Sequence, residues 1–519
     1  TGDFVLLCYT RNTPYSYDAQ TPVSVLALGT YLEERGVEVE YFDERIDGRA
    51  RFDALAARGP RVVGFSVIGG YQIHSAARLA RRARRISPDS ALVWGGILPT
   101  TLPELTARED YVDYVVLGEG EQVLFELYEA LGRGAKAARR VKGTLSMADG
   151  ELIRTAPAPL PDVEKLPFVY QGKAEWMLSR YENRESSRES VGFEASRGCP
   201  ALCTFCYSPN FHNTARLKPP AQVARELDRL RELGVADLDI YDDTLFGGRR
   251  EEFPTYLELL RERGFTWIGN LRINMLDGKM LRCIEDSGCK FIYYGIESND
   301  DRVLRLVKKG ITAEQVRAGV RLMREARIPA VYSLIYGMPI EGEKDKVGRI
   351  LDFAEELHQG DPDAEIQVQS YLPLPGSDLY SEAIRFGFKP PERLEGWVRH
   401  DHWGIENPWL DDPKLANKVY ISSFLAFRYR RHLSKTLLRF AAWPLHKLSL
   451  WRIRRRAFGL YFEGWLYALA LVGTEFLAGV YFWAQNVLSY IRTPKAPPVG
   501  ASGPVRKEKK SPCAESQAR

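Results

Sequence analysis

The sequence contains few cysteines and little excess charge of either sign. Seven cysteines in 519 residues are too few for a disulfide scaffold, and they are typical of a protein in a reducing cytoplasm. A net charge of +4 gives no general signal for nucleic-acid binding, so no nucleic-acid partner is expected. The first apolar run, residues 3–9, is too short for a signal peptide. The remaining composition predicts an ordinary globular protein of roughly two to four domains.

Three cysteines nevertheless lie close together in the middle of the chain. Cys199, Cys203 and Cys206 are separated by three and then two residues. Thiolates bind soft metal ions and iron–sulfur clusters. A structural zinc site normally has four protein ligands, and no fourth Cys or His follows here at a regular spacing. The spacing favours a cluster in which one iron lacks a protein ligand; buried structural cysteines or a zinc site are the alternative.

The pattern Cys-x3-Cys-x-Phe-Cys follows the strand-like residues 191–195 and resembles the signature of the radical S-adenosylmethionine (SAM) superfamily. This resemblance implies a [4Fe–4S] cluster on the three cysteines, which binds SAM and cleaves it to a 5′-deoxyadenosyl radical. It also implies that Phe205 lies beside the adenine of SAM. An external electron donor of the flavodoxin or ferredoxin type is implied as well.

The first 145 residues alternate between strand-like and helix-like segments. Strands are expected at residues 4–9, 37–42, 62–67, 91–94 and 114–117, and helices at residues 22–35 and 74–86. This alternation predicts a parallel α/β sheet, here a Rossmann-like domain of the flavodoxin-like kind.

Small residues follow three of these strands, at the sheet edge where open α/β domains bind ligands. Together these runs resemble the cobalamin-binding domain that precedes many radical SAM enzymes. The resemblance implies cobalamin-binding roles for Ser66, Val67, Gly95, Gly96, Gly118, Glu119 and Gly120. The Asp-x-His-x-x-Gly motif of classical B12 enzymes is absent, and His74, in a predicted helix, is the one histidine before the cysteines. We therefore expect no histidine below the cobalt, which residues 68–71 would cover; a domain that has lost cobalamin is the alternative.

Residues 146–190 are proline-rich and are predicted to form a linker, after which strands and helices alternate again over residues 191–400. Strands are expected at 238–241, 267–273, 290–295, 330–336 and 365–371, and helices at 222–233, 256–263, 278–287, 313–326 and 347–358. With the strand before the cysteines, six strand–helix units predict a partial (β/α)6 barrel of the TIM type. The C-terminal ends of its strands should carry the chemistry.

The radical SAM resemblance assigns roles at these strand ends. It implies that Asp242 and Asp243 contact the amino group of SAM, that Glu297 and Ser298 lie near the ribose, and that Gly337 lines the adenine. The alternatives are purely structural roles: a helix cap for the two aspartates and a surface ion pair for Glu297. Arg272 ends a strand on the same face and either holds a carboxylate or is structural.

Residues 401–493 are predicted to be helical, and residues 494–519 to be a disordered tail. His400 and His402 are expected in a lid or substrate pocket. A helix over residues 415–440 has a basic face, and residues 448–456 add four arginines. The apolar residues 464–491 could span a bilayer, but Glu475 and residues 485–486 interrupt them. Peripheral membrane contact through these helices is predicted; packing on the catalytic domain or on a second copy is the alternative.

These resemblances imply a cobalamin-dependent radical SAM enzyme that methylates an unactivated carbon. The radical would remove a hydrogen atom from the substrate, methylcobalamin would donate the methyl group, and a second SAM would restore the methylcobalamin. We expect a hydrophobic, lipid-like or natural-product substrate. One alternative is cyclisation, rearrangement or oxidation without methyl transfer. The other is a non-catalytic corrinoid and iron–sulfur sensor, although the C-terminal helices show no DNA-reading pattern that would serve as its output.

Overall fold

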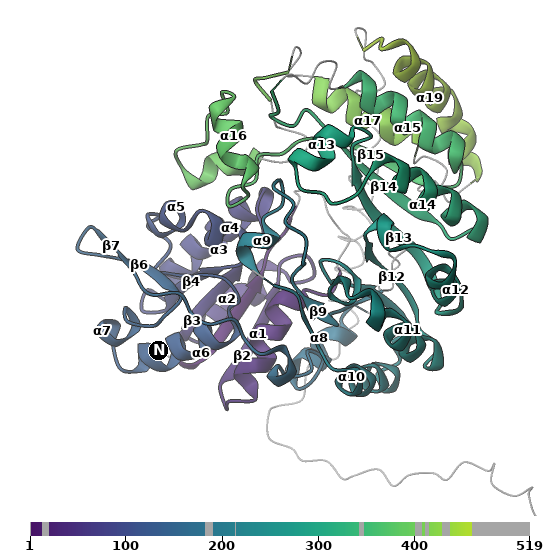
Figure 1. The fold of residues 1–519 in the computed structure, drawn as a ribbon. Helices are drawn as coiled ribbons and strands as arrows, with labels where there is room; N and C mark the ends of the chain where they lie inside the picture. Colours follow the sequence, from purple (N-terminus) through teal and green to yellow (C-terminus); the bar gives the residue numbers. More distant parts are fainter. Residues whose placement is uncertain are drawn as a thin grey trace, which may run out of the picture. The chain divides into compact units, whose positions relative to one another are not determined.

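The computed structural model describes residues 2–12, 20–181, 190–212, 214–341, 347–399, 407–410, 415–427 and 436–458. All of them belong to one compact unit, residues 1–461; residues 462–519 form a second unit that lies outside the described residues. Two β-sheets organise the first unit. Figure 1 shows the strands of the first sheet in purple and blue and those of the second in teal and green.

The first sheet has the strand order β2-β1-β3-β4-β5-β6-β7. Its parallel part consists of β1 (Gly2–Tyr9), β2 (Glu38–Asp43), β3 (Pro60–Ser66), β4 (Ala91–Gly95) and β5 (Tyr114–Val116). The order 2-1-3-4-5 is that of flavodoxin-like domains. The predicted flavodoxin-like α/β domain is therefore confirmed.

Helices cover both faces of this sheet, because alternate side chains of each buried strand point to opposite faces. Val5, Leu7 and Val93 pack with α1 (Val23–Glu33) and α6 (Glu121–Gly132). The residues between them, such as Leu6 and Trp94, pack with α2 (Arg49–Ala57) and α3 (Tyr71–Ile86). The short helices α4 (Ile97–Thr101), α5 (Pro103–Ala107) and α7 (Ala135–Ala138) lie in the connections.

The sheet continues past residue 145, where the sequence analysis began the linker. The strands β6 (Thr144–Ala148) and β7 (Glu151–Arg154) form an antiparallel hairpin beside β5. Its two-residue turn, Asp149-Gly150, has φ values of 51° and 82°. Asp-Gly favours such hairpin turns because both residues tolerate positive φ. The start of the linker at residue 146 was therefore wrong, and α8 (Lys173–Ser179) is a helix within it.

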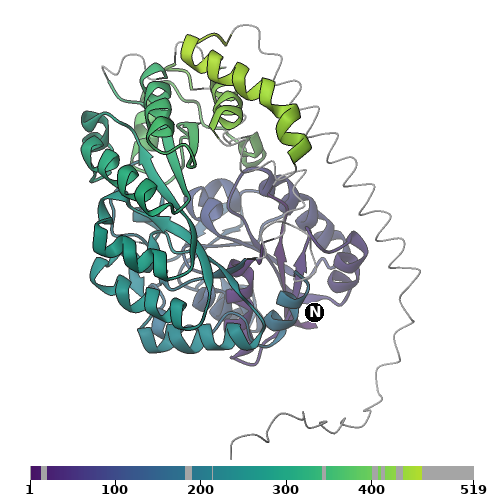
Figure 2. The same cartoon turned by 90° about the vertical axis from the view of Figure 1, so that its right-hand side faces the viewer.

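The second sheet contains six parallel strands in the order β15-β14-β13-β12-β11-β8. They are β8 (Val191–Phe193), β11 (Asp237–Ile240), β12 (Thr266–Leu271), β13 (Cys289–Glu297), β14 (Ala330–Tyr336) and β15 (Glu365–Ser370). The longer helices between them are α10 (Pro220–Glu232), α11 (Phe253–Glu262), α12 (Gly278–Asp286), α14 (Ala313–Ala326) and α15 (Gly348–Gly360), on the outer side of the curved sheet (Figures 1 and 2). The short helices α9 (Ser208–Phe211) and α13 (Asp301–Leu306) lie in two of the connections. The predicted partial (β/α)6 barrel is confirmed.

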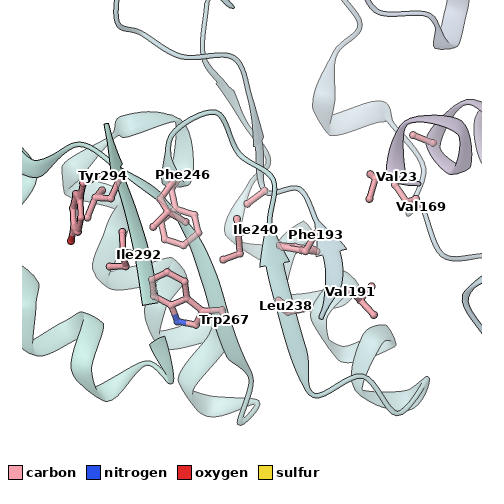
Figure 3. Close-up of a cluster of buried hydrophobic side chains, with 14 of the residues drawn as sticks. Val23, Val169, Val191, Phe193, Leu238, Ile240, Phe246, Trp267, Ile292 and Tyr294 are labelled. Carbon is pink, nitrogen blue, oxygen red and sulfur yellow. The ribbon is translucent and has the colours of Figure 1, made fainter. Parts of the chain in front are cut away.

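One hydrophobic core runs through both domains. It joins Val23 of α1 and Val169 of the connection to Phe193, Trp267 and other barrel residues (Figure 3). The edge strand β8 is also tied to the first domain through its backbone. The Gly192 N–H donates to Thr21 Oγ1 (3.0 Å), and the Tyr170 hydroxyl donates to the Gly192 carbonyl. The two sheets are thus held together by packing and by hydrogen bonds.

Three described α-helices follow the last barrel strand: α16 (Leu379–Arg385), α17 (Leu415–Phe427), which packs on β15, and α19 (Thr436–Arg455), which packs on α17. The predicted helix over 415–440 is not described as one element, because residues 428–435 lie outside the described residues. Residues 448–455 belong to α19 and do not form a separate segment. The predictions for His400, His402, residues 464–491 and residues 494–519 lie outside the described residues. Among the described helices, none is long and apolar enough to cross a membrane.

Candidate functional site

The three cysteines lie on a loop closed by a two-stranded antiparallel ribbon. The strands β9 (Ser196–Arg197) and β10 (Arg216–Leu217) pair at the base of this loop, which we call the cysteine loop. It begins with Gly198, whose φ is +83°. A Cβ atom at this position would lie 2.2 Å from the Thr214 carbonyl oxygen, so the sharp entry into the loop requires glycine.

The cysteines line one cavity of about 240 Å³, which we call the cysteine pocket. Among the described residues, no group of three His, Cys, Asp or Glu side chains is arranged as a site for one metal ion. Three thiols on one cavity fit a cubane cluster, in which each binds a different iron. Burial raises the pKa of Cys199 and raises that of Cys206 to about 11. Metal binding must therefore displace protons from these thiols.

The structure brings six predicted residues to the cysteine pocket: Cys199, Cys203, Cys206, Phe205, Asp243 and Arg272. Sequence reasoning missed Ser208, Asn270 and Lys309, which also line it. Two cations face this cavity. Arg272 Nη1 lies 4.0 Å from Cys203 Sγ, and Lys309 Nζ lies 5.7 Å from the Phe205 ring centre. A ligand with a carboxylate group therefore finds positive charge beside the cysteines.

The two adjacent aspartates after β11 have different environments. Asp242 is fully buried and accepts hydrogen bonds from the backbone N–H groups of Ala195 (2.9 Å), Ser196 (3.0 Å) and Phe246 (2.9 Å), and from the Ser196 hydroxyl (2.6 Å). Burial raises the pKa of Asp242 to about 7, although the hydrogen bonds from Ser196 and Ala195 oppose this shift. Asp242, predicted to contact SAM, does not line the cavity; its carboxylate instead fixes the start of the cysteine loop. Asp243 does line the cavity, and it accepts a hydrogen bond from the Ser208 hydroxyl (2.8 Å).

Three other predicted residues, Glu297, Ser298 and Gly337, do not line the cysteine pocket. Glu297 is buried at the end of β13 with a φ of +68°, and it accepts a hydrogen bond from Lys309 Nζ (2.7 Å). The surface ion pair considered for Glu297 is thus a buried pair, and this carboxylate acts on the cavity through Lys309. Ser298 accepts from the Asp300 N–H (3.1 Å), and the Gly337 carbonyl accepts from Trp409 Nε1 (2.7 Å).

A second cavity, of about 420 Å³, lies at the C-terminal edge of the first sheet, and we call it the sheet-edge pocket. Six of the seven residues predicted there line it: Ser66, Gly95, Gly96, Gly118, Glu119 and Gly120. Val67 does not, because it is buried and its carbonyl accepts from the Leu98 N–H (3.2 Å). A Cβ atom on Gly96 would lie 2.8 Å from this Val67 carbonyl. This wall of the sheet-edge pocket can therefore form only with glycine at position 96.

The opposite wall of the sheet-edge pocket comes from the barrel domain. It includes Tyr207, Phe211 and Tyr241, none of which the sequence analysis placed at a cobalamin site. A largely apolar cavity with glycine backbone on one side fits a large flat cofactor such as a corrin. Of the described lining residues one is a histidine, His212, and it belongs to the barrel domain.

A buried group of charges joins the two domains beside this cavity. Arg197 Nη1 lies 2.9 Å from Glu119 and 2.7 Å from Glu121, and Arg197 Nε donates to Glu194 (2.8 Å). Glu119 also pairs with Arg216 and lies 3.0 Å from His212 Nδ1. Burial raises the pKa of Glu119, but the hydrogen bond with His212 and the charges of Arg197 and Arg216 lower it more strongly, to about 2. Glu119 is therefore ionised at neutral pH and ties the Gly118–Gly120 turn to the base of the cysteine loop.

The two cavities adjoin at Asp243, which lines both. His212 Nε2 lies 3.8 Å from Asp243 Oδ2, on the side of the sheet-edge pocket. A ligand beside the cysteines and a ligand on the first sheet would therefore face each other across this aspartate.

Comparison with protein families agrees with this two-part site. Residues 16–127 match the model of the B12 binding domain, and residues 193–354 match the model of the radical SAM superfamily. The first match contains the sheet-edge glycines, and the second contains the cysteine loop. The residues of both cavities thus fit a [4Fe–4S] cluster, SAM and cobalamin.

Curated relatives resemble most of the chain at modest identity. An uncharacterized methyltransferase of Pyrococcus horikoshii is 29% identical over 381 residues, which cover 70% of this chain and 79% of the relative. The anaerobic magnesium-protoporphyrin IX monomethyl ester cyclase of Rubrivivax gelatinosus is 28% identical over 70% of this chain and 66% of its own length. The cytidylyl-2-hydroxyethylphosphonate methyltransferase of Streptomyces wedmorensis is 26% identical over 83% of this chain and 91% of the relative.

Two solved structures share the fold. The radical SAM methyltransferase TsrM of Kitasatospora setae, solved with cobalamin and a [4Fe–4S] cluster, has a TM-score of 0.59 at 20% identity, over 75% of this chain and 80% of TsrM. The cobalamin-dependent SAM radical enzyme OxsB has a TM-score of 0.64 at 17% identity, over 86% of this chain and 72% of OxsB. At these identities the likeness extends to the fold alone.

Proposed function

We propose that this chain, which belongs to the radical SAM enzymes with an N-terminal B12-binding domain, transfers a methyl group to an unactivated carbon of a hydrophobic small molecule. The observation that carries the proposal is the shared wall at Asp243. Because the two cavities adjoin there, a substrate held at this wall would have a cysteine-bound ligand on one side and a corrin on the other.

The chain's own residues hold and orient these ligands. Cys199, Cys203 and Cys206 would hold the cluster, and Arg272 and Lys309 would bind the carboxylate of SAM. The Gly118–Gly120 turn would support the corrin. When bound, the cluster with SAM supplies a carbon-centred radical, and cobalamin supplies the methyl group. An external one-electron donor of the flavodoxin or ferredoxin type is part of the proposal.

The lining of the sheet-edge pocket supports a hydrophobic substrate. On the barrel side its wall includes the rings of Tyr207, Phe211 and Tyr241, and its charged groups near Glu119 are already paired with one another. Such a wall excludes water and offers few hydrogen bonds to a polar substrate. Methyltransferases among the relatives support methyl transfer.

Ring formation or another oxidation without methyl transfer is the second candidate function. It is favoured by the resemblance to the Rubrivivax gelatinosus cyclase, which covers about two thirds of that enzyme. The same cavities would serve it, with the substrate radical closing a bond within the substrate.

The test uses full-length protein purified and reconstituted without oxygen, given SAM labelled on its methyl group, a reductant and a panel of hydrophobic natural-product precursors. Methyl transfer predicts bound corrinoid, 5′-deoxyadenosine, S-adenosylhomocysteine and a labelled product. A product that lacks the label would contradict methyl transfer and favour the cyclase-like reaction. Cys203→Ala is the matched control, because it removes one cluster ligand while leaving the sheet-edge pocket intact.

A further inference from the structure

Basic residues are concentrated near the C-terminal end of the chain. Residues 414–462 contain twelve Lys and Arg and no Asp or Glu. Because the whole chain has a net charge of +4, the other 470 residues together carry −8. The small net charge therefore conceals a strongly basic segment beside an acidic remainder. Such a segment indicates an anionic partner.

Helix α19 presents part of this segment in a fixed orientation. Its inner side, with His446, Ser449 and Ile453, is buried, and His446 Nδ1 lies 3.2 Å from the Leu425 carbonyl of α17. Arg454 Nε donates to Glu355 of α15 (2.6 Å). Figures 1 and 2 show α19 outside α17 and α15, so its other side faces away from the sheet.

The outer side of α19 carries two tryptophans and two cations. Trp443, Lys447, Trp451 and Arg455 recur every four residues and so share one side of the helix. Trp443 is 53% exposed and Trp451 is 51% exposed, and the side chains of Lys447 and Arg455 are exposed as well. Lys447 Nζ lies 5.8 Å from the Trp443 ring centre. We call these four residues the Trp–Lys face.

We infer that the Trp–Lys face docks on the surface of an anionic lipid bilayer. Indole rings prefer the interface between lipid headgroups and acyl chains, and nearby Lys and Arg are attracted to anionic headgroups. A nucleic acid would use the cations but would leave the indoles without a partner. The adjoining sequence points the same way, because residues 458–491 contain ten aromatic residues and only two charged ones, Glu463 and Glu475. The inference does not rest on the reaction proposed above.

The test is co-sedimentation of the full-length protein with vesicles of phosphatidylcholine alone and with vesicles that also contain phosphatidylglycerol. We expect binding to the anionic vesicles that weakens as salt is added. Lys447→Glu with Arg455→Glu should weaken this binding at least about twentyfold, since each cation near an anionic surface contributes about fivefold. Trp443→Ala with Trp451→Ala should weaken it about tenfold, by removing exposed indole surface.

Matched control variants carry the same chemical changes elsewhere. Trp176→Ala removes a tryptophan that is 47% exposed in the connection between the domains, and Arg282→Glu with Arg321→Glu reverses two exposed charges on α12 and α14. Both should bind anionic vesicles like the unchanged protein. If the tryptophan variant fails to fold, the charge variant still tests the face by itself.

Three results would overturn the inference. Equal binding by the Trp–Lys variants and the unchanged protein would place any attachment elsewhere. Equal binding to neutral and anionic vesicles would show that the cations of this face do not contribute to binding. Binding to duplex DNA that falls with the charge reversals but not with the tryptophan changes would identify a nucleic acid as the partner.

Discussion

Replacing Glu119 with glutamine tests whether the buried charges hold the two domains together. The substitution keeps the size of the side chain but removes the negative charge that faces Arg197, Arg216 and His212. Two buried guanidinium groups would then lose one of their acidic partners. Removal of one partner from a buried ion pair is strongly destabilising, because the remaining charge stays desolvated.

The magnitude follows from the pKa of Glu119. Its fall from 4.5 to about 2 means that the folded state favours the ionised carboxylate. This preference is worth about 3 kcal/mol at neutral pH, at 1.36 kcal/mol per pKa unit. Because the folded-state pKa is the lower one, the stabilisation is complete above about pH 4.5 and is lost as the pH falls towards 2. At about pH 3.5 it should have decreased to about 2 kcal/mol.

Urea unfolding of the oxygen-free protein, followed by tryptophan fluorescence, measures this difference. Glu119→Gln should unfold at lower urea than the unchanged protein at neutral pH, and the gap should narrow at about pH 3.5. Glu258→Gln is the control, since Glu258 pairs with Arg261 on the exposed surface of α11 and should leave the midpoint unchanged. The reasoning is refuted if Glu119→Gln matches the unchanged protein at neutral pH, or if the gap widens on acidification.

Three further substitutions probe the cofactor sites. Gly96→Val, whose Cβ would crowd the Val67 carbonyl, should lower the bound corrinoid at least about tenfold without changing the iron content, whereas Gly48→Val, at a glycine with open space around it, should change neither. Lys309→Met should raise the dissociation constant for SAM about tenfold or more in equilibrium binding, because it removes a cation from the cysteine pocket. Cys203→Ser should abolish the bound iron and sulfide measured after reconstitution, while the corrinoid content stays unchanged.

The sequence predicted most of the fold because each strand–helix unit carries its own signal. Continuous apolar runs mark strands buried on both faces, and the helices between them have one apolar side. The hairpin of β6 and β7 was missed, although Asp149-Gly150 is a strong hairpin signal. Because proline-rich residues follow this hairpin, the sequence analysis assigned the hairpin itself to the linker and began the linker too early, at residue 146.

The candidate site was predictable where its residues are close in the sequence and not where the fold brings them together. The spacing of the cysteines is local, and all three reach one cavity. The pairing of Glu119 with Arg197 and Arg216 joins residues 78 and 97 positions apart, which no local pattern reveals. For Asp242, by contrast, the local sequence does contain a signal of burial. Leu238, Ile240 and Asp242 are alternate residues, and all three are buried. Asp242 therefore continues the buried side of β11, whereas Asp243 points to the other side.

The same long-range contacts connect the walls of the two cavities. The Gly118–Gly120 turn lines the sheet-edge pocket, and Arg197, which pairs with Glu119, is two residues before Cys199. A movement of the turn therefore displaces the base of the cysteine loop through the ion pairs of Glu119 with Arg197 and Arg216. Asp242 fixes the same base from the barrel side, through its hydrogen bonds to Ala195 and Ser196. Since Asp243, the next residue, forms the wall that both cavities share, the position of this wall depends on a few polar contacts. A substitution at one of these contacts should impair a reaction that needs ligands in both cavities before it unfolds either domain.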